Sequence, residues 1–377
     1  MILTKYNIRL EGQVRFVPIN EIQPGTELKQ TVFGGNGEIL LNSGVVLDNY
    51  YLNKLKKLGL NGVYIEDAIS EGIEVKDIIG DELRQKSIKH IKQTFLTVQK
   101  PHVSEQEKEH QFDELNQTVK NVVDEVLSNN DLMINMIDLK VFNEYTFYHS
   151  LNVALIAIVL GVSLGLSKQD LNELCLASFL HDIGKLFVPD TILNKSGPLS
   201  EKEMSVIKKH PQDGRDYLHK HHQISNKTAE GIYSHHEKWN GTGYPEQLKH
   251  SDIPFFGRII SVADVYDALV SDRPYRCGYE PSDALEYILS GNDLFFDPSV
   301  VDALMSKVSP YPLGSIVFLS NNTTGIVVKN FEKRGSRPLV RVFEENGKIV
   351  SPYILDLCSS SNLSVTITGT KKQTSAQ

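Results

Sequence analysis

Residues 145–185 have the sequence YTFYHSLNVALIAIVLGVSLGLSKQDLNELCLASFLHDIGK, and this stretch decides the fold. Apolar residues dominate both halves at helical spacing, and the halves are separated by a short glycine-containing break. The pattern predicts two helices, over 145–164 and 168–180. Helical spacing returns at 200–209, 228–237, 258–269 and 281–289. We therefore expect an all-α core between residues 131 and 309.

Short β-type runs lie on both sides of this core. From residue 14 to residue 66, the runs VRFVPI, GEILL, GVVL and GVYIE alternate with Gly, Pro and Asn turns, and one helical pattern interrupts them near 49–58. After residue 310, SIVFL, GIVVKN, PLVRVF and IVSPYIL are joined by Asn-containing turns. The chain is thus predicted to be mainly α, with a small β-rich N-terminal module (1–66) and a small C-terminal β-barrel or meander (310–377) that ends in a polar tail.

A charged, glycine-poor segment, residues 67–130, joins the N-terminal module to the core. Its composition and period predict two connector helices. Five apolar residues in it follow a +3, +4, +3, +4 seam. The seam has two alternative uses, packing onto the next domain or self-association of the chain as a homodimer. The seam residues are Phe112, Leu115, Val119, Val122 and Val126.

Composition limits the class of protein. The 377 residues are 40% hydrophobic and 23% charged, which are ordinary values for a globular protein. The formal net charge is -8 and no block of Lys and Arg stands out, so no broad nucleic-acid surface is expected. The N-terminus lacks a signal-like apolar stretch, no uninterrupted apolar run approaches the roughly 18 residues of a membrane span, and the three cysteines form no CxxC pair. We expect a cytoplasmic protein without membrane contact.

The helical region concentrates histidines and aspartates on apolar helices or at their ends. Such groups are costly to bury unless they are paired or bind an ion. Five imidazoles and two carboxylates exceed the four ligands of a structural zinc, and no sulfur accompanies them, so two iron or manganese ions fit better than zinc. Two such ions can promote in-line displacement at phosphorus, which predicts a phosphohydrolase. The candidate ligands are His149, His181, Asp182, His210, His235, His236 and Asp264.

Four ordered motifs resemble those of one known family. They are HDIGK at 181–185, KKHP at 208–211, SHHEKWNGTGYP at 234–245 and VADVYDALVSDRPYR at 262–276. Together they resemble the HD-GYP subgroup of HD-domain phosphohydrolases over residues 131–309. The resemblance implies a helical HD-domain bundle, two or three metal ions, and hydrolysis of the bacterial messenger cyclic di-GMP.

The resemblance also implies how the ligands are shared. It places one ion among His149, His181, Asp182 and Asp264, and another among Asp182, His210, His235 and His236, with Asp182 as the bridge. The catalytic residues that it implies are His181, Asp182 and Lys185, the last at the scissile phosphate. For substrate binding it implies Lys185, Arg273 and Arg276, and the forked guanidinium donors of the arginines suit a phosphodiester. Asp267, three residues past Asp264 on the same side of the helix, could also face the substrate and orient a water or the leaving group, or else serve as a helix cap or in a salt bridge.

A glycine-rich loop follows the histidine pair, and two positions in the chain depart from the family pattern. The loop residues Gly243, Tyr244 and Pro245 are the subgroup signature, which we interpret as structural or as a contact for a protein partner. Asn240 stands where the family usually has aspartate. Tyr145 stands four residues before His149, where members with three metal ions have a glutamate. We therefore predict two ions and no third, and linear pGpG rather than GMP as the end product.

Two alternative functions remain open at this point. The site could bind cyclic di-GMP as a receptor that signals to a partner through the β modules, although such receptors usually lack ligands that are present here. Alternatively, the substrate could be another cyclic dinucleotide. The sequence does not separate purine preferences.

Overall fold

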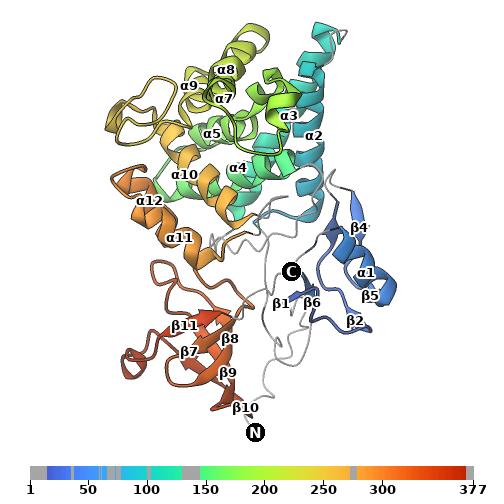
Figure 1. Ribbon diagram of the computed structural model, residues 1–377, viewed down its shortest axis with the longest axis vertical. Helices are drawn as coiled ribbons and strands as arrows, with labels where there is room; N and C mark the ends of the chain where they lie inside the picture. The colour runs from blue at the N-terminus through green and yellow to red at the C-terminus, as the bar shows by residue number, and fades with distance from the viewer. Residues whose placement is uncertain are drawn as a thin grey trace.

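The computed structural model describes residues 15–34, 38–58, 60, 62–65, 73, 78–99, 103–129, 145–271 and 278–370. Helices form the upper part of the molecule in Figure 1, and two small β modules lie below them. This arrangement confirms the mainly α class with β modules at both ends. The predicted domain limits at 66 and 130 fall outside the described residues. Near the third limit, the last helix ends at Lys307 and the C-terminal sheet begins at Ile316.

Helices α4 (Tyr145–Ser163) and α5 (Lys168–Leu180) form the centre of the helical part, as the sequence pattern predicted. The side chains from Leu151 to Leu160 are buried all round α4, so this helix has no polar face. Gly165, with φ at +77°, lies in the turn after α4, and the Ser167 side chain accepts a hydrogen bond from the backbone N–H of Asp170 to begin α5. Helices α9 (Asn226–Ser234) and α10 (Phe255–Val270) pack against this pair.

Shorter helices complete this part of the fold. Helix α8 (His210–His221) was not predicted, because it is buried through His210, Pro211, Gly214 and Leu218 rather than through a periodic apolar face. The ten-residue α12 (Pro298–Lys307) was also missed, and α9 ends three residues earlier than predicted. The remaining elements are η1 (Ile183–Phe187), α6 (Asp190–Leu193), α7 (Glu201–Ile207), α8 (His210–His221), η2 (His250–Asp252), α11 (Pro281–Ser290) and α12 (Pro298–Lys307).

One described helix has the length and composition of a membrane span. The window Thr146–Ser163 in α4 has a mean hydropathy of 1.6. However, 78% of this window is buried inside the protein. Its apolar side chains therefore pack within the helical core of the protein.

The connector segment forms two long helices, α2 (Asp81–Gln99) and α3 (Glu105–Ser128), as predicted. Every seam residue from Phe112 to Val126 is at most 5% exposed and belongs to the same apolar core as α4 and α5. Phe95 of α2 meets Phe147 of α4 edge to face, with ring centroids 5.6 Å apart. Of the two alternatives, the seam therefore packs within its own chain.

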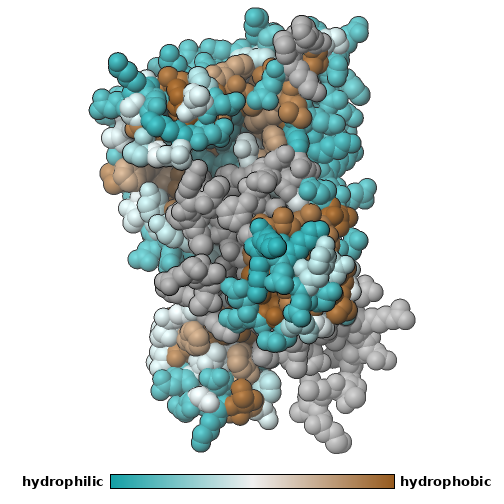
Figure 2. Space-filling model, turned by 45° about the vertical axis from the view of Figure 1, so that its right-hand side comes forward, coloured by the Kyte–Doolittle hydropathy of each residue, from teal (hydrophilic) through white to brown (hydrophobic). Residues whose placement is uncertain are grey.

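In its described residues, the N-terminal module contains three antiparallel strand pairs and one helix. Its core is made of aliphatic residues such as Leu28, Leu47 and Val63. The helix buries Leu52 and Leu55, whereas its last turn carries three lysines, and hydrophilic residues gather where this module faces the viewer in Figure 2. The pairs are β1 (Arg15–Pro18) with β6 (Gly62–Ile65), β2 (Thr26–Glu27) with β5 (Val46–Leu47), and β3 (Val32–Phe33) with β4 (Ile39–Leu41), and the helix is α1 (Asn49–Lys57).

The C-terminal module is a five-stranded antiparallel sheet in the order β10-β9-β8-β7-β11. The first four strands form a meander, and the last returns to pair with β7. The structure thus selects the meander over a barrel. The strands are β7 (Ile316–Leu319), β8 (Thr323–Lys329), β9 (Leu339–Glu345), β10 (Lys348–Asp356) and β11 (Ile367–Thr370), with η3 (Ser360–Asn362) before the last.

The contact between α3 and the end of α8 predicts a pH-dependent stability. His222 stacks on Phe112 with ring centroids 4.1 Å apart. Burial, helped by the neighbouring His221, lowers the pKa of His222 to about 4. The unfolded chain therefore binds a proton at this site below about pH 6.5 that the folded chain does not bind, so the free energy of unfolding should fall by about 1 kcal/mol from pH 7 to pH 5.

His222→Phe is the matched variant, because it keeps the ring stack and removes the titration. Urea unfolding at both pH values should show a smaller loss of stability in this variant than in the wild type. Equal losses in the two proteins would contradict this assignment.

Candidate metal centre

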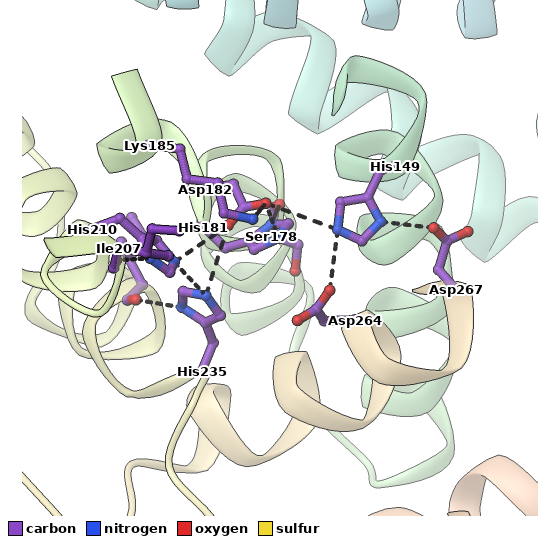
Figure 3. A network of polar contacts seen from close by, with 11 residues as sticks. His149, Ser178, His181, Asp182, Lys185, Ile207, His210, His235, Asp264 and Asp267 are labelled. Atoms are coloured by element: carbon purple, nitrogen blue, oxygen red, sulfur yellow. Dashed lines mark hydrogen bonds and ion pairs between the residues drawn. The ribbon is translucent and has the colours of Figure 1, made fainter. Parts of the chain in front are cut away.

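Helices and helix ends from distant parts of the sequence converge on one cluster of imidazoles and carboxylates (Figure 3). His181 and His235 are at most 1% exposed, so the cluster lies inside the fold rather than on its surface. The contributing elements are α4 with His149, the end of α5 with His181 and Asp182, the start of α8 with His210, the end of α9 with His235 and His236, and α10 with Asp264.

The cluster divides into two groups with Asp182 between them. Within each group the potential ligand atoms lie within 4.8 Å of one another. Asp182 Oδ1 lies 3.4 Å from His210 Nε2, and Oδ2 lies 3.4 Å from His181 Nε2, so the two oxygens of one carboxylate face different groups. The groups are Asp182, His210, His235 and His236, and His149, His181 and Asp264.

Three of the histidines are oriented by the same local contact. The Nδ1 atoms of His181, His210 and His235 lie 2.7–2.8 Å from the carbonyl oxygens of Ser178, Ile207 and Ile232, each three residues upstream. A carbonyl oxygen only accepts, so each Nδ1 carries the proton and donates. The lone pair of each ring is thereby left on Nε2, the atom that faces the cluster, which is the tautomer that a metal ligand needs.

Asp267 holds the fourth oriented histidine. It is fully buried, with Oδ2 at 2.7 Å from His149 Nδ1 and Oδ1 accepting from Asn152 Nδ2 at 3.0 Å. Asp267 therefore lies behind His149, in an ion pair that agrees with the second of the two roles considered for it. The sequence analysis missed Asn152, although a buried amide three residues after His149 in an apolar helix was a usable signal.

The charges differ between the two ends of the cluster. Burial opposes protonation of His149, but its hydrogen bonds to Asp264 and Asp267 raise the pKa to about 9, so this end is strongly negative in potential. At the other end, burial lowers the pKa of His236 to about 3 and lowers that of His235 as well. Burial would raise the pKa of Asp182, but Lys185 and His181 hold it well below its usual value. The ionised carboxylate of Asp182 and the neutral imidazoles of His235 and His236 are thus in the protonation states that bind cations, whereas His149 must release a proton to do so.

Among the residues that the structure describes, two buried atoms of the cluster find no hydrogen-bond partner, namely His181 Nε2 and Asp182 Oδ1. Leaving such atoms unsatisfied costs about 1–3 kcal/mol each, and a coordinated cation removes this cost. The donor set contains nitrogen and oxygen but no sulfur, as divalent transition-metal ions accept. The residues of this cluster thus fit divalent metal ions.

Lys185 lies at the edge of the cluster. Its Nζ is 2.6 Å from Asp182 Oδ2, and its side chain is 34% exposed. The α-helix does not continue through HDIGK, because α5 ends at Leu180 and the 3₁₀ helix η1 follows. Lys185 is therefore aligned with Asp182, three residues away, rather than with His181.

A close backbone contact brings α8 to the cluster. A Cβ atom on Gly184 would lie 1.9 Å from the carbonyl oxygen of His210 and 2.7 Å from the backbone nitrogen of Gly214. Only a glycine in HDIGK allows η1 and α8 to approach this closely. The placement of His210 beside Asp182 depends on this contact.

Residues 123–300 match the HD domain family. Within this range, the motifs that resembled one subgroup bring their histidines and aspartates to a single centre. This part of the chain is an HD-GYP domain. A solved structure, Bd1817, a HDG"Y"P protein from Bdellovibrio bacteriovorus, supports the fold with a TM-score of 0.50, 18% identity, and coverage of 77% of this chain and 98% of that one.

Curated proteins similar to the HD-GYP domain have names that state an activity. The chain is 38% identical over 218 residues to cyclic di-GMP phosphodiesterase PA4108 of Pseudomonas aeruginosa, which covers 58% of this chain and 52% of that protein. It is 36% identical over 158 residues to 3'3'-cGAMP-specific phosphodiesterase 2 of Vibrio cholerae, which covers 42% of this chain and 30% of that protein. The chain spans about half the length of the first relative and less than a third of the second.

The predicted site residues fall into three sets. All the candidate ligands lie in the one cluster, with Lys185 beside it. The signature residue Tyr244 lies next to it with its ring against His236, and Gly243 lies against the backbone of Glu237 and Lys238. Arg273 and Arg276 lie outside the described residues, and Tyr145 begins α4 one turn before His149.

The contact at Gly184 gives a prediction for metal binding. Gly184→Ala forces the start of α8 away from η1, because the clashing atoms belong to the backbone and cannot rotate aside. We expect a loss of about 1–3 kcal/mol in stability and a clear weakening of metal binding, measured by titration with Mn²⁺.

Gly369→Ala is the control, because the nearest atom to its added Cβ lies 4.0 Å away. It should change neither quantity. Unchanged Mn²⁺ binding in folded Gly184→Ala would show that the close approach does not position His210.

Proposed function

We propose that this protein hydrolyses one phosphodiester bond of cyclic di-GMP, giving linear pGpG, at a centre that holds two iron or manganese ions. The observation that carries the proposal is the position of Asp182, whose two oxygens face two separate groups of imidazoles. A bridging carboxylate between two nitrogen-rich sites suits a two-metal hydrolase. The names of the similar curated proteins supply the substrate class.

The assignment of ligands follows the two groups. One ion would be held by His149, His181, Asp182 and Asp264, and the other by Asp182, His210, His235 and His236. When bound, two divalent ions supply a hydroxide nucleophile at neutral pH and stabilise the oxygens of an in-line displacement. This ligand set is nitrogen-rich and lacks sulfur, which favours iron or manganese over a structural zinc.

The chain's own residues orient the substrate. Lys185, anchored by Asp182 and partly exposed, can donate from its ammonium to a phosphate oxygen beside the centre. Water adds to phosphorus, the bond from phosphorus to the 3′ oxygen breaks, and the leaving oxygen takes a proton, so the product is a linear dinucleotide with a 5′ phosphate. Asp267 and Asn152 keep His149 fixed from behind.

The proposal specifies two ions rather than three. Tyr145 lies one helical turn before His149 in α4, at the position where a third ion would need a carboxylate. A phenol is a poorer ligand for a hard divalent cation than a carboxylate. We therefore connect the two-ion centre with a reaction that stops at pGpG.

The first prediction of this proposal concerns turnover. Protein purified without oxygen and loaded with Fe²⁺ or Mn²⁺ should convert cyclic di-GMP to pGpG, as measured by chromatography of the products. Faster hydrolysis of 3′3′-cyclic GMP-AMP would reassign the substrate within the same class, in line with the name of the Vibrio cholerae relative. Tight binding of cyclic di-GMP without any product would identify a receptor instead and contradict the proposal.

The second prediction concerns Asp182. In Asp182→Ala, the bridge between the two groups is lost, so bound metal should fall from two ions to at most one per chain, and hydrolysis should fall by about 100-fold or more. Asp302→Ala, which removes an exposed carboxylate on α12, is the control and should match the wild type. Full activity in Asp182→Ala, or three ions in the wild-type protein, would contradict the two-metal centre.

A further inference from the structure

His236 differs from the other imidazoles of the cluster in how it is held. In the part of the chain that the structure describes, neither of its ring nitrogens makes a hydrogen bond, whereas Nδ1 of each of the other four is hydrogen-bonded. Its ring contacts are with other rings, and the centroids of His235 and His210 lie 4.1 Å and 5.0 Å away. Hydrogen bonding therefore does not fix the angle of this ring.

A flat contact with the ring of Tyr244 sets the angle of the His236 ring instead. The Tyr244 ring stacks on His236 with centroids 4.8 Å apart and an angle of 29° between the planes. The backbone N–H of Tyr244 also donates to the carbonyl oxygen of His236 at 3.2 Å. The two residues are thus joined twice, once through the backbone and once through the rings.

The loop between them is built to return over His236. A Cβ atom on Gly243 would lie 2.3 Å from the backbone nitrogen of Lys238, so only glycine lets the chain fold back this tightly. Beyond the turn, the buried carboxylate of Glu237 accepts hydrogen bonds from the backbone N–H groups of Glu246 and Gln247 at 2.7 Å and 3.0 Å. Both sides of Tyr244 are therefore tied to the segment that directly follows His236.

The ring of Tyr244, rather than its hydroxyl, makes the contacts. Among the described residues the hydroxyl forms no hydrogen bond, while the ring stacks on His236 and has the ammonium of Lys208 over it, 5.3 Å from the centroid. Stacking and cation–π contacts both act on the face of the ring. A phenylalanine would keep both.

We propose that Tyr244 is a positioning residue, which holds the His236 ring at the angle needed to bind the second metal ion. The inference rests on the ligand assignment of the proposed function and deepens it. By this account, Gly243 permits the return of the loop, and Tyr244 acts through His236 on the ion shared with His210 and His235. Groups behind a metal ligand typically change metal affinity by about 10- to 100-fold when they are removed.

The test measures metal binding directly. The full-length protein is titrated with Mn²⁺, and its electron paramagnetic resonance spectrum separates an exchange-coupled pair of ions from a single ion, which gives six lines. Tyr244→Phe should keep two ions and the coupled spectrum. Tyr244→Leu should bind one of the two ions about 10- to 100-fold more weakly and give the six-line spectrum at one ion per chain.

Thr242→Ala is the matched control in the same loop, because it removes only the hydroxyl contact with Asn240 and leaves the ring stack in place. It should keep both ions. Loss of the second ion in Thr242→Ala or in Tyr244→Phe, or wild-type binding in Tyr244→Leu, would overturn the proposal. If thermal unfolding shows that Tyr244→Leu does not fold, Tyr244→Gln replaces it in the comparison with Tyr244→Phe.

The wild-type protein separates this inference from the proposed function. Two coupled ions without hydrolysis of cyclic di-GMP would remove the proposed substrate and leave the role of Tyr244 measurable. Fewer than two ions in the wild type would overturn the ligand assignment and this inference together.

Discussion

The buried carboxylate of Asp182 is the constraint on which the rest of the helical domain depends. An ionised carboxylate at this depth is unfavourable unless cationic or polar groups surround it. Here, imidazoles from three helix ends and the ammonium of Lys185 approach its two oxygens. The helices that carry these groups must all end or begin at one point, and this requirement explains why α5, α8 and α9 meet there.

Two kinds of contact orient the histidines: contacts within the same helix turn, and contacts with residues farther along the chain. His181, His210 and His235 each donate to a carbonyl three residues upstream, so their tautomers are determined locally, as soon as the helix end forms. His149 and His236 instead depend on partners from other segments, Asp267 and Tyr244. The His149 end is therefore assembled only when α4 and α10 pack together, whereas the His236 end forms within one loop.

Much of this could be predicted from the sequence, because helical periodicity and buried polar residue types are local signals. The central helices and the β modules follow from such patterns, and the residues that meet at the centre form a recognisable set by residue type and by their place on apolar helices. The helix that starts at His210 could not be predicted, since it is buried through histidine, proline and glycine. The position of Asp267 behind His149 could not be predicted either, because helical spacing shows on which face of a helix a side chain lies but not how deeply it is buried.

The packing of α2 and α3 against α4 has a consequence for how the chain is made. The segment Thr146–Ser163 is apolar enough to resemble a membrane span when it is considered alone. Both connector helices precede it in the sequence, so they leave the ribosome first and are available to cover it as it emerges. The order of synthesis thus lets the apolar helix that carries His149 find its packing partners already made.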